Sequence, residues 1–271
     1  MSKLKYLPLL LLIILSSSCG EEPLNDWQFK EGDLNTIVVD AILTNEHHRH
    51  RVKISKPLRN PNDIPEPVSG AAVSILLDGQ SYSLIENPLR PGTYINPIII
   101  DDQIGNTYSL KIDYEEKIYE ATAKMKPVNV FGHFTFAPVP NTDSLTIKNP
   151  PALIDEFEQA MYEINIDWSH LSNTGKTRTK IFFYTFNTID VGQIFSPPKE
   201  TIQFPRGSRI LVKKYSLTSE YAAFLRALVA ESQWQGGLFE ESRDNLPSNI
   251  SNDGLGFFSA CAVLTDSLIA E

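Results

Sequence analysis

Apolar and polar residues alternate through the first half of the chain, and this pattern constrains the fold more than any other feature of the sequence. Between residues 108 and 114, for example, every second residue is apolar. Successive side chains of a strand point to opposite faces, so a period of two indicates strands with one buried face. Turn signals such as Asp78-Gly79 and Pro91-Gly92 separate these segments. We therefore predict an immunoglobulin-like β-sandwich over residues 34–126, with strands at 37–39, 51–54, 72–77, 81–85, 93–95, 108–114 and 119–125.

The rest of the chain, residues 127–271, predicts a second β-rich lobe. Pro127 ends the first lobe, because proline cannot extend a central strand. Strands are expected at 162–168, 181–186 and 209–215. Residues 181–186 are apolar on both faces and predict a central strand, whereas the polar segment 141–151 predicts a loop. The fold class is therefore mainly β.

One α-helix is predicted at about residues 218–235. Thr218 or Ser219 can cap its beginning, and Gly236-Gly237 follows its end. Its apolar residues recur at helical spacing and are expected to face a core rather than a ligand; they are Tyr221, Phe224, Leu225, Leu228 and Val229.

The amino terminus has the three parts of a secretory signal. Lys3 and Lys5 precede an apolar run, and small serines follow it up to Cys19. The apolar run of about nine residues is well short of the ~20 that span a bilayer, which argues against a transmembrane anchor. A cysteine after small residues resembles the cleavage site of a bacterial lipoprotein. The resemblance implies a signal peptide at 1–18, lipid on Cys19 and attachment to the membrane through that lipid.

Residues 19–33 are expected to form a tether between the lipid and the first lobe. Its acidic pair, Glu21-Glu22, resembles the export signal that sends some lipoproteins to the outer face of the outer membrane. The alternative is a simple solvated tether. The precursor has a formal charge of −9, and loss of Lys3 and Lys5 leaves 22 basic against 33 acidic residues, or −11. This acidity argues against a nucleic-acid partner.

Two side-chain clusters suggest metal binding at first sight. His47, His48 and His50 are expected at a hairpin tip, where they lack a neighbouring Cys or spaced carboxylate and where Arg49 repels a cation. Asp101-Asp102 lacks the alternating ligands of a calcium loop, so a solvated turn is the better interpretation. We expect no metal and no cofactor.

The sequence has no nucleophile elbow, zinc-protease helix, phosphate loop or dinucleotide fingerprint. His133 and His170 have no evident acid or nucleophile partner, so no catalytic residue is assigned and a non-enzyme is expected. Cys261 lies in an apolar run and is expected to be a small core residue.

Asn249 and Asn252 are expected to satisfy turn backbone rather than contact a ligand. Trp27 and Trp234 could meet a partner, since aromatic residues are enriched at interfaces. Trp234 is more simply interpreted as a cover for the helix end.

Several segments together carry a resemblance to a known family. They are 67–73 (PVSGAAV), 91–94 (PGTY), 105–110 (GNTYSL), 119–121 (YEA) and above all 246–260 (LPSNISNDGLGFFSA). Their order resembles the outer-membrane lipoprotein family catalogued as domain of unknown function 4249, and the first lobe is also similar to transthyretin-like sandwiches. The family resemblance implies a surface lipoprotein, often encoded beside a TonB-dependent receptor.

The functional hypothesis is a surface-exposed outer-membrane lipoprotein that is a non-catalytic accessory or ligand-capturing partner of a TonB-dependent receptor. One alternative is a structural role in envelope assembly or adhesion without a small ligand. A surface hydrolase is the third interpretation.

Overall fold

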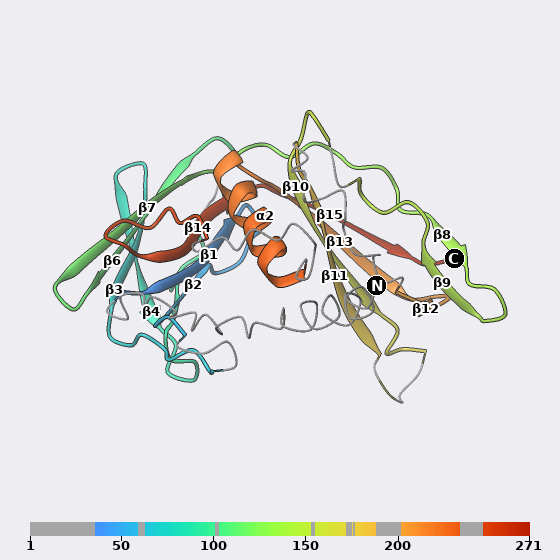
Figure 1. The fold of residues 1–271 in the computed structure, drawn as a ribbon, viewed down its shortest axis with the longest axis horizontal. Coiled ribbons are helices and arrows are strands. Elements are labelled where there is room, and N and C mark those ends of the chain that lie inside the picture. The colour runs from blue at the N-terminus through green and yellow to red at the C-terminus, as the bar shows by residue number, and fades with distance from the viewer. Residues whose placement is uncertain are drawn as a thin grey trace, which may run out of the picture. The chain divides into compact units, whose positions relative to one another are not determined.

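The computed structural model describes residues 36–58, 63–100, 103–152, 155–171, 175, 177–187, 202–233 and 246–271. These residues belong to one compact unit, Asn35–Glu271. The unit is mainly β, as predicted, with α2 (Ser219–Gln233) as the helix of the described part (Figure 1). The predicted signal peptide and tether lie outside the described residues.

The first sheet contains all the strands predicted for the first lobe. They are β1 (Val38–Thr44), β2 (Arg51–Ser55), β3 (Ala72–Leu77), β4 (Gln80–Glu86), β5 (Thr93–Ile95), β6 (Thr107–Tyr114) and β7 (Lys117–Lys124). An eighth strand, β14 (Leu255–Cys261), joins from the other end of the chain, and the order is β14-β1-β2-β5-β4-β3-β6-β7. The alternating apolar residues fill one core, which includes the buried Tyr94, Tyr108 and Tyr119.

The two outer strands of this sheet, β7 and β14, are joined across their edges. Lys126 forms a parallel bridge with Cys261 directly after β7. Asn249 donates to the carbonyl oxygens of Phe258 in β14 and Thr122 in β7. The sheet therefore closes around its core, which is the arrangement of a β-sandwich or barrel.

Two further sheets form the second lobe. A four-stranded antiparallel sheet has the order β11-β10-β13-β15, with β10 at Ala160–Asp167, β11 at Arg178–Thr185, β13 at Arg209–Ser216 and β15 at Val263–Ile269. A small sheet has the order β12-β9-β8, with β8 at Phe136–Pro138, β9 at Ser144–Ile147 and β12 at Phe204–Pro205. A second core that includes Leu145, Ile164, Phe204 and Val212 brings residues of both sheets together.

Two assignments in the second lobe are corrected by the structure, and strands β8, β12 and β15 were not expected from the sequence. The segment 141–151 is not only a loop, because β9 lies within it and pairs with β8 and β12. The strand expected to be central, β11, is at the sheet edge. Its residues are apolar on both faces because Ile181 and Phe183 pack on the second core, while Tyr184 packs on a third.

The carboxy-terminal segment connects the sheets. Only Ala262 separates β14 in the first sheet from β15 in the four-stranded sheet. The Ser216 hydroxyl sits at this junction, where it donates to the Lys126 carbonyl (2.8 Å) and accepts from the Ala262 amide (2.9 Å). Residues 127–271 therefore supply the two further sheets and also β14, so the first sheet takes one strand from beyond the predicted boundary at residue 126.

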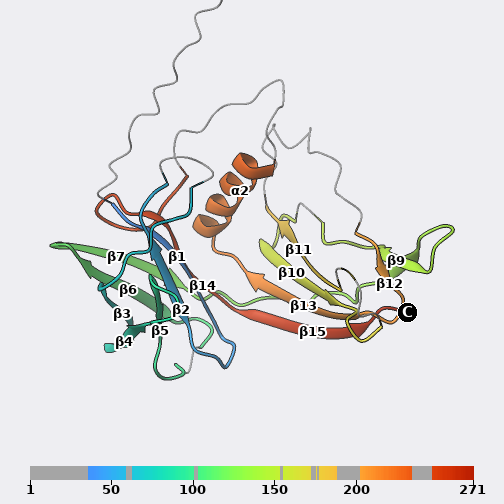
Figure 2. The ribbon, with the colours of Figure 1, turned by 90° about the horizontal axis from the view of Figure 1, so that it is seen from below.

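Helix α2 lies over this junction (Figure 2). Its Tyr221, Ala222 and Leu225 belong to a third core that also contains Phe257 of β14 and Val263 of β15. The predicted apolar stripe of the helix thus faces a core, although Leu228 at its side is 38% exposed.

Candidate functional site

The four-stranded sheet has one covered face and one partly open face. On the covered face, Tyr162, Ile164 and Ile166 of β10 pack into the second core. On the other face the strand register forms rows across β11, β10, β13 and β15. Helix α2 covers the row of Tyr184, Met161, Tyr215 and Val263. The rows beyond it are called here the open face, and they contain Phe182, Glu163, Lys213, Thr265, Lys180, Asn165, Leu211, Ser267, Arg178, Asp167, Arg209 and Ile269.

Ion pairs order the part of the open face nearest the helix. Lys180 Nζ lies 2.8 Å from Glu163 Oε1, and Asn165 donates to the same oxygen at 2.8 Å. Partial burial alone would raise the pKa of Glu163, but the hydrogen bonds from Asn165 and Lys180 and the nearby Lys213 charge lower it overall. Glu163 therefore stays ionised at neutral pH.

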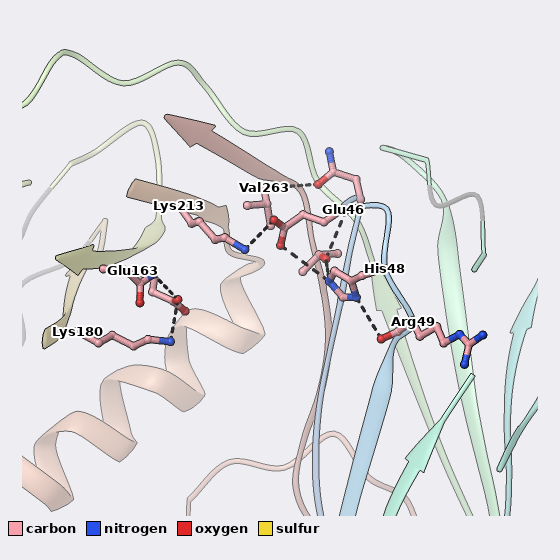
Figure 3. A network of polar contacts seen from close by, with 10 residues as sticks. Glu46, His48, Arg49, Glu163, Lys180, Lys213 and Val263 are labelled. Atoms are coloured by element: carbon pink, nitrogen blue, oxygen red, sulfur yellow. Dashed lines mark hydrogen bonds and ion pairs between the residues drawn. The ribbon is translucent and has the colours of Figure 1, made fainter. Parts of the chain in front are cut away.

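A second ion pair joins the open face to the hairpin between β1 and β2 (Figure 3). Lys213 Nζ lies 2.7 Å from Glu46 Oε1. Beside this pair, the Asn45 side chain accepts from the Val263 amide at 2.6 Å. These contacts fix the hairpin against the edge of the open face.

The far end of the open face contains a shallow, open hollow of about 630 Å³. Arg209, Asn165 and Ser267 supply polar groups to it, and Leu211 and Ile269 supply apolar ones. Ile210 and Leu268 also line it, but their side chains belong to the second core, so they contribute backbone.

Asp167 is the acidic group of this hollow, and its charge is already paired. Its carboxylate accepts from the Ser169 amide at 2.8 Å and lies 2.9 Å from Arg178 Nε. The hydrogen bonds with Ser169 and the Arg178 charge lower the pKa of Asp167. Among the described residues, no ion pair is found for the exposed Arg209, so the hollow has an uncompensated positive charge.

The predicted histidine cluster lies at the β1–β2 hairpin, as expected. His48 Nε2 lies 3.0 Å from Thr44 Oγ1 and 3.9 Å from Glu46 Oε2, and its ring meets that of the buried His50 edge-on at 4.9 Å. His47 is exposed. In the described part of the chain, no group of three or more His, Cys, Asp or Glu side chains is arranged to hold a metal ion.

The other histidines lie apart from the hairpin cluster. His133 is almost fully exposed and lies 3.9 Å from Asp266 Oδ2. His170 Nε2 lies 3.0 Å from the Gly207 carbonyl oxygen. Neither contact includes a nucleophile.

Asn249 and Asn252 contact backbone, as expected, but they do so across strands. Asn249 accepts from the Phe258 amide at 3.0 Å and donates to its carbonyl at 2.8 Å. The side-chain amide of Asn249 therefore takes the place that the backbone of a neighbouring strand would have. Asn252 donates to the Ile118 carbonyl of β7. Both asparagines therefore hold the junction between β7 and β14.

Cys261 is a core residue, as predicted. Its side chain is fully buried, and burial raises the pKa of its thiol to about 12. Ser259 Oγ lies 3.5 Å from its sulfur. Such a thiol is a poor nucleophile at neutral pH.

Cys19, Trp27, Asp101, Asp102 and Trp234 lie outside the described residues. No sequence motif singles out Arg209, Ser267 or the Glu46–Lys213 pair. The alternation within residues 209–215 was a usable signal, because it places Arg209, Leu211 and Lys213 on one face.

No helix in the described part of the chain is long and apolar enough to cross a membrane. No curated protein matches the chain. The family model described as domain of unknown function (DUF4249) matches residues 25–267, which cover both lobes and the tether's end. The chain therefore belongs to the DUF4249 family.

Proposed function

We propose that this protein is an outer-membrane lipoprotein, anchored through lipid on Cys19 and facing the cell exterior. In this proposal it is a non-catalytic accessory or ligand-capturing partner of a TonB-dependent receptor. The lipoprotein-like signal, the acidic tether and the family membership support the proposal.

The open face is the observation that carries the binding role. Phe182 is 43% exposed, Leu211 36% and Ile269 58%, although all three belong to a regular sheet. The water-facing side of an antiparallel sheet is ordinarily polar. Exposed apolar surface rimmed by polar residues marks sites that meet a ligand or a partner, and aromatic residues and Arg are enriched at such sites.

Affinity purification from membranes tests the receptor partnership. We expect the native protein to recover a TonB-dependent receptor in stoichiometric amount, and the Phe182→Ser/Leu211→Ser variant to lose it. Ile85→Ser is the matched control, because Ile85 is 63% exposed on β4, away from the open face. Recovery of no receptor, or equal recovery by both variants, would contradict the proposal.

The anchor has a separate test. Cys19→Ala removes the only sulfur available for lipid near the signal, so this variant should leave the membrane fraction. Protease treatment of intact cells should cleave the native protein if it faces outward. Continued membrane attachment of Cys19→Ala, or full protection from protease, would contradict the proposed anchoring or orientation.

A further inference from the structure

We propose that the hollow on the open face binds a small organic monocarboxylate, with Arg209 holding the carboxylate and an apolar chain lying on Leu211 and Ile269. The inference rests on the proposed ligand-capturing function and names the ligand class of the same face.

Charge is the first reason. The whole chain has a formal charge of −9, yet Arg209 presents an exposed guanidinium with no ion pair among the described residues. The acid nearest in register, Asp167, is already paired with Arg178 at 2.9 Å. An anionic ligand is therefore the complement of this hollow.

Hydrogen-bond geometry favours a carboxylate. The planar guanidinium fork matches a carboxylate with two parallel hydrogen bonds. The Ser267 hydroxyl and the Asn165 amide line the same hollow. Asn165 donates one hydrogen bond to Glu163, and its second N–H is available to a ligand oxygen.

The apolar lining selects a ligand with a hydrocarbon part. Ile269 and Leu211 flank the polar groups and are 58% and 36% exposed. A chain of several methylenes laid on them removes apolar surface of both partners from water. A bare inorganic anion gains nothing from these two side chains.

Calorimetric titration of the full lipidated protein in a non-ionic detergent tests the inference, with a detergent-only blank. Hexanoate is the probe; acetate, hexan-1-ol and inorganic phosphate are the comparison compounds. We expect saturable hexanoate binding at least tenfold tighter than that of acetate or phosphate, and no saturable binding of hexan-1-ol.

Arg209→Gln is the informative variant and Arg206→Gln its matched control. Arg206 is also exposed but does not line the hollow, so Arg206→Gln removes the same charge at another place. We expect Arg209→Gln to weaken hexanoate binding at least tenfold, or about 1.4 kcal/mol. The dissociation constant of Arg206→Gln for hexanoate should stay within about twofold of the native value.

Three results would overturn the inference: no saturable hexanoate binding, equal effects of the two arginine variants, or phosphate binding as tight as that of hexanoate. If the native protein does not bind hexanoate but Arg209→Gln no longer recovers the receptor, the face would be assigned to a protein partner instead. Hexanoate binding through Arg209 with no receptor recovered would support the inference and contradict the receptor partnership, so the two failures are distinguishable.

Discussion

The eight-stranded sheet and the four-stranded sheet use their strands differently. In the first, the outer strands β7 and β14 are linked by Asn249, and the alternating apolar residues enclose one core. In the second, one face packs on a core while most of the other remains exposed beyond helix α2. The first sheet therefore uses its strands to enclose a core, whereas the second sheet leaves one face available for binding.

The largest expected effect concerns the dependence of the first sheet on the carboxy terminus. A fragment of residues 34–126 contains seven strands but lacks β14, the parallel partner of β1. We expect this fragment to show no cooperative unfolding transition by circular dichroism, because β1 becomes an open edge and the core loses Phe258 and Ala260.

A peptide of residues 246–262 added to the fragment is the control and should restore protection from protease. A fragment that unfolds cooperatively without the peptide would show that the first lobe is an independent domain and would remove the main contrast between the sheets.

The two faces of the four-stranded sheet are compared directly by adjacent lysines of β13. Lys214 is 2% exposed and contacts Glu158 and the Asn129 carbonyl, whereas Lys213 lies on the open face and pairs with Glu46. Lys214→Ala leaves the carboxylate of Glu158 largely buried without its partner, so the free energy of unfolding should fall by about 3 kcal/mol. Lys213→Ala should cost less, about 1–2 kcal/mol, because the side chains of Lys213 and Glu46 keep 23% and 24% of their surface exposed to solvent.

Urea denaturation of the two variants measures the difference. Equal losses would mean that the open face is as tightly packed as the covered face and would contradict the difference between them.

Gly256 tests how closely β14 approaches β1. Its φ is +87°, and an added Cβ would collide with the Val39 carbonyl. Gly256→Ala should lower the free energy of unfolding by about 2–3 kcal/mol through strain and displacement of the strand. A Cβ at Gly132 would meet nothing within 4 Å. Gly132→Ala should therefore change the free energy of unfolding by less than about 0.5 kcal/mol. Similar melting temperatures for the two variants would contradict the close approach.

The smallest expected effect is a pH dependence from Cys261 at the junction of the sheets. Burial raises the pKa of the Cys261 thiol to about 12 in the folded protein. The neutral thiol therefore contributes fully to the free energy of unfolding below the pKa that it has in the unfolded chain. This contribution declines as the pH rises above about 9. Between pH 8 and pH 10, urea denaturation should show the native protein losing about 1 kcal/mol more than Cys261→Ala. Parallel losses in both proteins would show that the thiol does not titrate with unfolding.

Local patterns were sufficient to predict most of the elements. All the strands of the first lobe and the helix at 219–233 follow from periodicities of two and 3.6 residues, because these periods report which side chains share a face. The segment 141–151 was assigned wrongly because β9 is short and its pairing partners, β8 and β12, lie on separate parts of the chain.

The candidate site was less accessible to sequence reasoning. Arg209, Asn165 and Ser267 each occupy an ordinary polar position of a strand, and nothing in their spacing indicates a hollow. They meet only because β10, β13 and β15 are neighbours in register. The sequence drew attention instead to His47, His48 and His50, which are adjacent in the chain.

The sequence by itself determined the mainly β class, the strand faces, the helix and its core-facing stripe. The tertiary structure alone decided that β14 completes the first sheet, that β11 is an edge, and that Arg209 faces an open hollow. The physical reason is that side-chain periodicity encodes burial of a face, whereas the neighbour of each strand is chosen by packing over long sequence separations. Val38 and its partner Leu255 are 217 positions apart in the sequence, and this pairing leaves no local trace.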